Sequence, residues 1–133
     1  MIFLPDTNAC VTLLRERNPL LIARWQAVKA SEIVLCAVVV YELRHGAERS
    51  SNPPREHAKL DGFLSPFPSL PFDDACAHKC AEIRHTLERT GGVIGPHDLQ
   101  IAAIALRHGL TLVTHNTKEF SRVPGLKLED WEI

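Results

Sequence analysis

Acidic and amide side chains stand directly after several short apolar stretches of this chain. Asp6 follows the first apolar stretch, and Glu42 lies one helical turn beyond the second. Asp98 stands in the first turn of a helical pattern, and Asn116 and Glu119 follow the apolar stretch after it. Four separate segments therefore carry carboxylate or amide oxygens toward one end of any sheet that these stretches form.

Carboxylates that meet in one pocket are typical of a site that binds a divalent cation. Asp6, Glu42 and Asp98 would repel one another in a shared pocket, and a divalent cation relieves that repulsion. Oxygen ligands without a cluster of His or Cys favour Mg²⁺ or Mn²⁺ over zinc. These cations recruit phosphate oxygens, which suits hydrolysis of a phosphodiester. The pattern therefore indicates a metal-dependent enzyme that acts on phosphodiester bonds.

Each of these residues also has an ordinary structural interpretation. Asp6 can form an Asx turn with the backbone of Asn8, and Asp98 can cap a helix or interact with its dipole. Glu42 and Glu119 can be exposed charges. The functional interpretation rests on the combination of all of them, because any one short motif is weak.

The elements that position these residues alternate along the chain. Short apolar stretches bounded by turn residues predict strands at 2–4, 33–36, 69–72 and 110–113, with an edge strand at 127–128. Helical spacing predicts helices between them, the first capped by Asn8, the second after Pro19, and the others at 38–49, 54–64, 74–90 and 97–108. This alternation predicts an α/β three-layer sandwich around a mostly parallel sheet of four to five short strands. Function in such sheets gathers beyond the carboxyl ends of the strands.

Length and composition predict one globular domain spanning residues 1–133. The chain is 45% hydrophobic and 23% charged, as globular proteins are. Its longest apolar run, Val34–Tyr41, is far shorter than the ~20 residues that cross a bilayer. The first residues lack the pattern of a secretion signal. We therefore expect a cytoplasmic protein without a membrane association.

The net charge of −1 does not by itself indicate a nucleic-acid-binding protein. A nuclease needs a basic rim only where its substrate lies. Seven basic residues of the first half can supply that rim, or can belong to solvated helix faces: Arg15, Arg17, Arg24, Lys29, Arg44, Arg49 and Arg55.

The four cysteines are scattered among apolar neighbours, as small buried hydrophobic residues are in a reducing compartment. A zinc site built from Cys76, His78, Cys80 and His85 is conceivable. However, Cys76 and Cys80 share the apolar face of a helix from which His78 points away, and the spacing of a structural zinc site is absent.

Four segments of the chain together resemble the successive motifs of VapC-type toxins, a family of PIN-domain ribonucleases. They are FLPDTNACV, CAVVVYELRHGAERS, IGPHDLQIAA and LVTHNTKEFSRVPGLKLEDW, and they occur in the family's order over nearly the whole chain. The resemblance implies a PIN-like fold and an Mg²⁺- or Mn²⁺-dependent endoribonuclease. Its expected products carry a 5′-phosphate and a 3′-hydroxyl.

The resemblance also assigns roles. Asp6, Glu42 and Asp98 match the family's metal-holding acids. A fourth polar position, commonly acidic in the family, falls on Asn116, with Glu119 as a substitute. Thr7 and Thr114 match positions where small hydroxyls support the site. Two residues depart from the pattern. Pro5 replaces an apolar residue and can end the first strand early, and His97 precedes Asp98 where relatives vary.

Partners are implied by the resemblance alone. They are a second copy of the chain in a homodimer and a VapB-type antitoxin whose extended tail fills the acidic groove. The antitoxin would carry the complex to operator DNA. The expected substrate is structured RNA, in particular transfer RNA.

Other classes fit the residues less well. A haloacid-dehalogenase-type phosphatase needs a second acid where Asn8 stands, and a receiver domain fits neither the spacing nor the Glu42 motif. A serine hydrolase lacks its G-x-S-x-G sequence. Two alternatives stay open, namely a non-catalytic PIN-like module that binds RNA or protein and a PIN-fold nuclease that acts on DNA.

Overall fold

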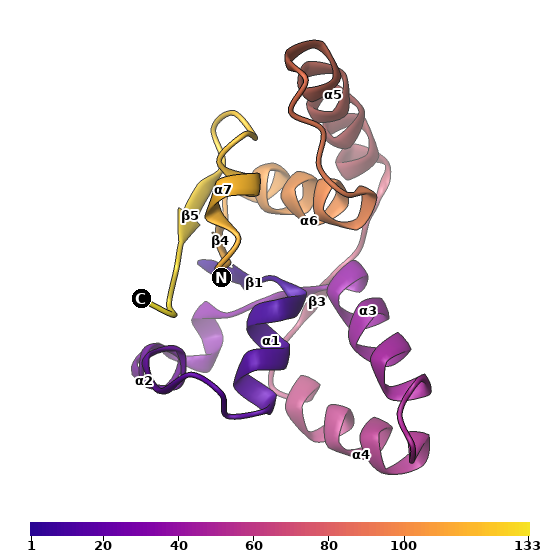
Figure 1. Ribbon diagram of the computed structural model, residues 1–133, viewed down its shortest axis with the longest axis vertical. Helices are drawn as coiled ribbons and strands as arrows, with labels where there is room; N and C mark the ends of the chain where they lie inside the picture. The colour runs from indigo at the N-terminus through magenta and orange to yellow at the C-terminus, as the bar shows by residue number, and fades with distance from the viewer.

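Parallel strands form the centre of the computed structural model, which describes all residues from 1 to 133 (Figure 1). One sheet has the order β1-β4-β5, and a separate pair is β2-β3. A single bridge between Phe3 and Ile33 links the two, which gives the overall order β3-β2-β1-β4-β5. The strands span β1 (Phe3–Pro5), β2 (Leu35–Cys36), β3 (Ser69–Leu70), β4 (Thr111–Val113) and β5 (Lys127–Glu129). The predicted parallel α/β fold is confirmed, with the difference that β1 and β2 share only one bridge.

Helices cover both faces of the strands. In Figure 1, α1, α2 and α4 lie below the strands, and α5 and α6 lie above them. The helices are α1 (Thr7–Leu14), α2 (Pro19–Ala27), α3 (Ala37–Glu48), α4 (Pro53–Leu64), α5 (Asp74–Thr90), α6 (Pro96–Arg107) and α7 (Thr117–Phe120). A short 3₁₀ turn, Ala30–Glu32, precedes β2. None of these helices is both long and apolar enough to cross a membrane.

Helix α6 is the most deeply buried helix and lies against both α5 and β4. Ala102, Ala103 and Ala105 are completely buried, and the larger Ile101 and Ile104 are buried beside them. The small alanine side chains let neighbouring elements approach closely, while each isoleucine removes a large apolar surface from water. This packing holds the first turn of α6, which carries Asp98, in a defined position.

The expected early end of the first strand at Pro5 was wrong. Pro5 is the last residue of β1 and pairs with Val113 of β4. The next N–H, that of Asp6, still donates to the Val113 carbonyl at 2.9 Å. Proline lacks an N–H donor, and β1 tolerates it where the pairing toward β2 consists of one bridge at Phe3.

Candidate active site

Asp6 lies at the carboxyl end of β1, between the end of the strand and the start of α1. Its Oδ1 accepts a hydrogen bond of 2.8 Å from the Ala9 N–H, and the residue is only 5% exposed. Asp6 is therefore the N-cap of α1. The prediction that Asn8 caps this helix was wrong, because the helix starts at Thr7, directly after the strand.

Glu42 reaches the same end of the sheet from the second turn of α3. The helix follows β2 directly and buries Val39, Leu43 and Ala47 against the core. Glu42 lies beside this buried face. Its Oε1 accepts a hydrogen bond of 2.5 Å from the Thr7 hydroxyl, so that α3 and α1 are joined next to Asp6.

Asp98 occupies the first turn of α6. Pro96 stands at the first helical position, and the N-cap Gly95 has no side chain to satisfy the free N–H groups. Asp98 is half-buried. The adjacent His97 places its Nδ1 3.2 Å from Oε2 of Glu42, which brings the start of α6 to α3.

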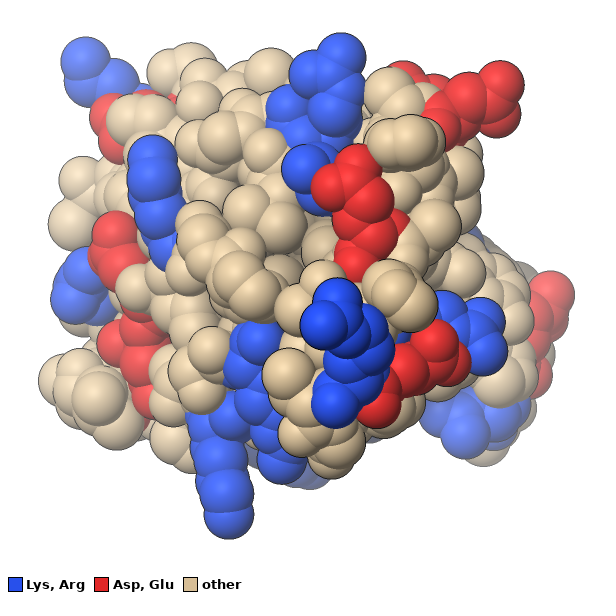
Figure 2. Space-filling view, turned by 90° about the horizontal axis from the view of Figure 1, so that it is seen from above, with Lys and Arg blue, Asp and Glu red and all other residues tan.

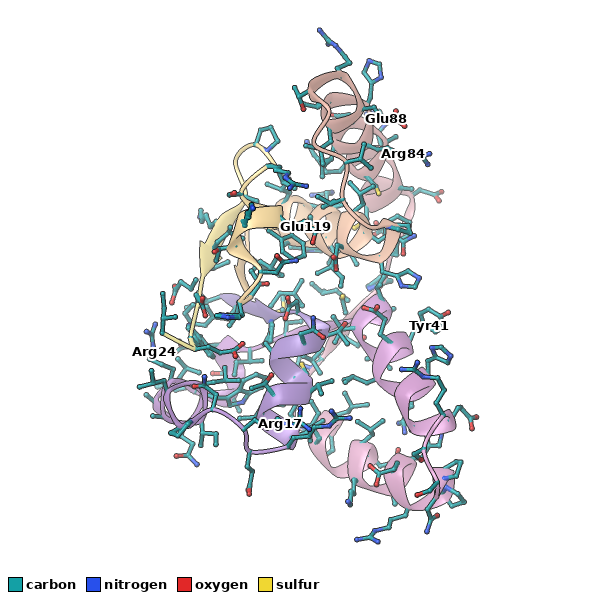
Figure 3. All side chains as sticks on the ribbon, viewed as in Figure 1. Arg17, Arg24, Tyr41, Arg84, Glu88 and Glu119 are labelled. Atoms are coloured by element: carbon teal, nitrogen blue, oxygen red, sulfur yellow. The ribbon has the colours of Figure 1, made fainter.

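The fourth polar position involves both of the predicted residues. Glu119 on α7 accepts a hydrogen bond of 3.2 Å from the Gly95 N–H at the start of α6. Its other oxygen accepts a short hydrogen bond from the Asn116 amide. Asn116 is exposed, and its backbone N–H donates to the buried Thr114 hydroxyl at 3.0 Å. Figure 3 shows Glu119 beside α6. Among the neighbouring charges, that of Glu119 does most to raise the pKa of Asp98.

Two acids of this group hold their protons more tightly than usual. The pKa of Asp98 is raised from 3.8 to about 6, mainly by burial and in addition by the charges of Glu119, Asp6 and Glu42. Burial also raises the pKa of Asp6 to about 6, although hydrogen bonds from Thr114 and Ala9 oppose it. Raised carboxyl pKa values are typical of functional sites. We call Asp6, Glu42, Asp98 and Glu119 the acidic group.

The acidic group fits a divalent cation. It offers carboxylate oxygens from four elements and no sulfur or uncommitted imidazole ligand, which suits Mg²⁺ or Mn²⁺. A bound positive charge would offset the repulsion that raises the pKa of Asp98. No three of these carboxylates have oxygens that all lie within 4.8 Å of one another. In this arrangement the acids would supply only part of the ligands of a bound cation and water would supply the rest, as is usual for Mg²⁺.

A family model described as the PIN domain matches residues 3–126. The match runs from β1 to just before β5 and includes the whole acidic group. The chain belongs to the PIN-domain family. PIN-domain nucleases generally use a divalent metal ion, in agreement with the oxygen donors found here.

Relatives narrow the family further. This PIN domain is 36% identical over 129 residues to the tRNA(fMet)-specific endonuclease VapC of Salmonella typhimurium, covering 97% of each chain. It is 36% identical over 133 residues to ribonuclease VapC2 of Rickettsia felis, covering 99% of each chain. The solved structure of DNA-bound VapBC from Salmonella typhimurium matches with a TM-score of 0.92 and 35% identity, over 98% of each chain. The resemblance to VapC ribonucleases is thereby confirmed, and this PIN domain is a nuclease.

A hollow of about 780 Å³ opens next to the acidic group, between α1, α3 and α4. Thr7 and Glu42 line it near the strands, and Arg15, Arg49 and Lys59 line it further along the helices. The predicted basic rim is therefore present in part. Other basic residues form surface ion pairs instead, and basic and acidic side chains are interspersed over the face seen in Figure 2.

The structure does not bring the imagined zinc ligands together. Cys76 is buried in α5, whereas His78 is exposed with its Nε2 2.9 Å from Glu82. The one group of His, Cys or acidic side chains with ligand atoms within 4.8 Å of one another is His115, Asp130 and Glu132. Asp130 is already bound by its neighbours, to the His115 Nδ1 and the Glu132 N–H, each at 2.9 Å.

Sequence reasoning missed a cluster of aromatic rings beside the acidic group. The Tyr41 ring stacks on His45 with a centroid distance of 6.3 Å and an interplanar angle of 9°. It also meets the His97 ring edge-on at 5.4 Å. The spacing of four residues between Tyr41 and His45 could have indicated the first contact. No local pattern indicates the second, because the residues lie on different helices.

Proposed function

We propose that this PIN domain is the toxin of a type II toxin–antitoxin pair and an endoribonuclease that hydrolyses phosphodiester bonds in structured RNA, in particular transfer RNA, with Mg²⁺ or Mn²⁺. The observation that carries the proposal is the acidic group, in which four elements bring carboxylates to the carboxyl end of the sheet and burial, with the neighbouring charges, raises the pKa of Asp98. The Salmonella typhimurium relative, which acts on tRNA(fMet) by its name, supports the class of substrate.

In this proposal the acidic residues have different roles in binding the metal ion and orienting water. Asp6 and Asp98 would hold the cation directly, and Glu42 would hold it directly or through water. The cation, when bound, makes water more acidic and offsets the negative charge that develops at the phosphate. Glu119 orients the attacking water, and Asn116 positions Glu119 through the hydrogen bond between their side chains. The N-terminus of α6 adds a positive dipole end near the phosphate.

The expected partners follow from the relatives. Solved structures of VapBC complexes from Salmonella typhimurium and Rickettsia felis contain DNA, in the second case a promoter fragment. We propose that this chain likewise binds a VapB-type antitoxin and reaches operator DNA through it. We also propose a homodimer, which the mass of the purified protein in solution will test. Transfer RNA as substrate implies a cytoplasmic location.

The test is cleavage of total bacterial transfer RNA by the purified, antitoxin-free protein. We expect discrete fragments with Mg²⁺ or Mn²⁺, none with EDTA, and none from the Asp98→Asn variant. Asn has nearly the shape of Asp, so this variant should fold and retain the parent's circular dichroism spectrum. Cleavage of DNA alone would instead assign a DNA nuclease. If metal-loaded protein cuts neither nucleic acid, the chain is a binding module and the proposed function is wrong.

A further inference from the structure

Tyr41 is an aromatic side chain held at the edge of the active site with much of its ring in water. It is 56% exposed, although it stacks on His45 and contacts His97. Figure 3 shows it extending from α3 toward solvent, away from the strands. Single exposed apolar residues are common on protein surfaces. Tyr41 differs from them because two neighbouring rings fix its orientation while one surface stays free.

The Tyr41 ring and the acidic group both contact the same residue, His97. His97 contacts the Tyr41 ring on one side, and its Nδ1 lies 3.2 Å from Oε2 of Glu42 on the other. Only one imidazole therefore separates Tyr41 from a carboxylate of the acidic group. Tyr41 and Glu42 also line the same hollow, so the ring borders the acidic group on the side where this hollow opens.

The adjacent hollow offers cations to the phosphates of an RNA strand. Tyr41 lines this hollow together with three basic and two acidic side chains, namely Arg15, Arg49, Lys59, Glu42 and Glu56. Of these cations, Lys59 lies 3.4 Å from Glu56, while Arg15 and Arg49 form no salt bridge. Cations without an acidic partner attract phosphates. Single-stranded RNA is commonly recognised by stacking of its bases on aromatic side chains.

We propose that Tyr41, oriented by His45 and His97, is the stacking face for an unpaired RNA base next to the scissile phosphate. The ring binds any base through its π-face and so holds the strand in place without reading its sequence. It is a substrate-positioning residue, and the inference rests on the proposed function, because it requires that the acidic group acts on RNA.

Equilibrium binding of a short, mixed-sequence, single-stranded RNA tests the proposal. We place the Tyr41 variants in the Asp98→Asn background with Mg²⁺, so that the strand is not cut. An abasic strand of the same length is the second probe. Tyr41→Ala should weaken binding of the RNA roughly tenfold, the size of one base–aromatic contact, and leave binding of the abasic strand unchanged. Tyr41→Phe should bind both strands as the Tyr41 protein does. Leu20→Ala, at another exposed apolar residue outside the hollow, is the matched control and should change neither.

Three results would overturn the proposal. The first is equal binding of the RNA by the Tyr41→Ala and Tyr41 proteins. The second is an equal loss for both strands, which would make the role of the ring structural. The third is unchanged RNA binding with weaker binding of the co-expressed antitoxin, which would assign the surface to the protein partner. A failure of the proposed function would be recognised separately, because the parent protein, with Tyr41 intact, would then not cleave RNA.

Discussion

The Thr7 hydroxyl donates a 2.5 Å hydrogen bond to Oε1 of Glu42, across 35 positions of sequence. Thr7 follows Asp6 directly, so this bond sets the position of the second acid relative to the first. His97 contacts the other oxygen of Glu42 at 3.2 Å. The Glu42 carboxylate is thereby held from two sides, by groups on α1 and α6.

Thr7→Ala should lower kcat/KM for RNA cleavage by roughly tenfold or more, because hydrogen bonds to charged groups contribute about 1.5–3 kcal/mol. Thr7→Ser keeps the hydroxyl and should retain most of the activity. Single-turnover cleavage at saturating Mg²⁺ measures both. Equal loss in the two variants would mean that the threonine methyl group matters and the hydrogen bond does not.

Glu119 should matter more than Asn116 for cleavage. Among the neighbouring charges, that of Glu119 has the largest effect on Asp98, whereas Asn116 acts through its hydrogen bond to Glu119. We expect Glu119→Gln to reduce kcat by about a hundredfold, as loss of a group acting in the transition state does, and Asn116→Ala by several-fold only. Cleavage rates under one set of conditions give the ranking. The reverse order would assign the fourth polar position to Asn116.

The buried Asp6 should make the metal-free protein less stable as pH rises. Its pKa is raised from 3.8 to about 6, so between these values the folded state binds more protons than the unfolded state and loses stability with increasing pH. A shift of this size corresponds to about 3 kcal/mol at most. Asp6→Asn keeps a good N-cap without the charge. In EDTA, urea unfolding should show the parent losing about 2–3 kcal/mol relative to Asp6→Asn between about pH 4 and about pH 7. Parallel pH profiles would contradict this.

Mg²⁺ should raise the melting temperature at neutral pH, because a ligand that binds only the folded state stabilises it, by about 2.7 kcal/mol at a hundredfold excess over Kd. The Asp98→Asn variant should lose most of this shift. Asp130→Asn, in the separate group with His115 and Glu132, should keep it. Loss of the shift in Asp130→Asn alone would place the cation at that other group. Differential scanning fluorimetry with and without Mg²⁺ decides between the two.

Local signals were sufficient for several elements. The bounds of α5, Asp74–Thr90, agree with the prediction because both ends have their own signals. The Asp73 side chain accepts a hydrogen bond from the Cys76 N–H at 2.9 Å, and Gly91 ends the helix with a φ of 73°. The alternation of strands and helices similarly predicted the parallel sheet. Since parallel strands present their carboxyl ends at one edge, it also placed Asp6 at that edge.

Other features depend on contacts between residues far apart in the chain. Helix propensity alone permits Asn8 as a cap, and the geometry of β1 against β4 decides for Asp6. The hydrogen bond that supports our proposed choice of Glu119 over Asn116 comes from the Gly95 N–H, 24 positions away.

The sequence by itself therefore determined the fold class and predicted Asp6, Glu42 and Asp98 together with Asn116 or Glu119, because residue type, periodicity and strand order are local properties. Only the tertiary structure decided which groups orient those acids. The Thr7–Glu42 and His97–Glu42 contacts span 35 and 55 positions, and the Tyr41 ring meets His97 from another helix. The packing of whole helices fixes such distances, and no local pattern encodes them.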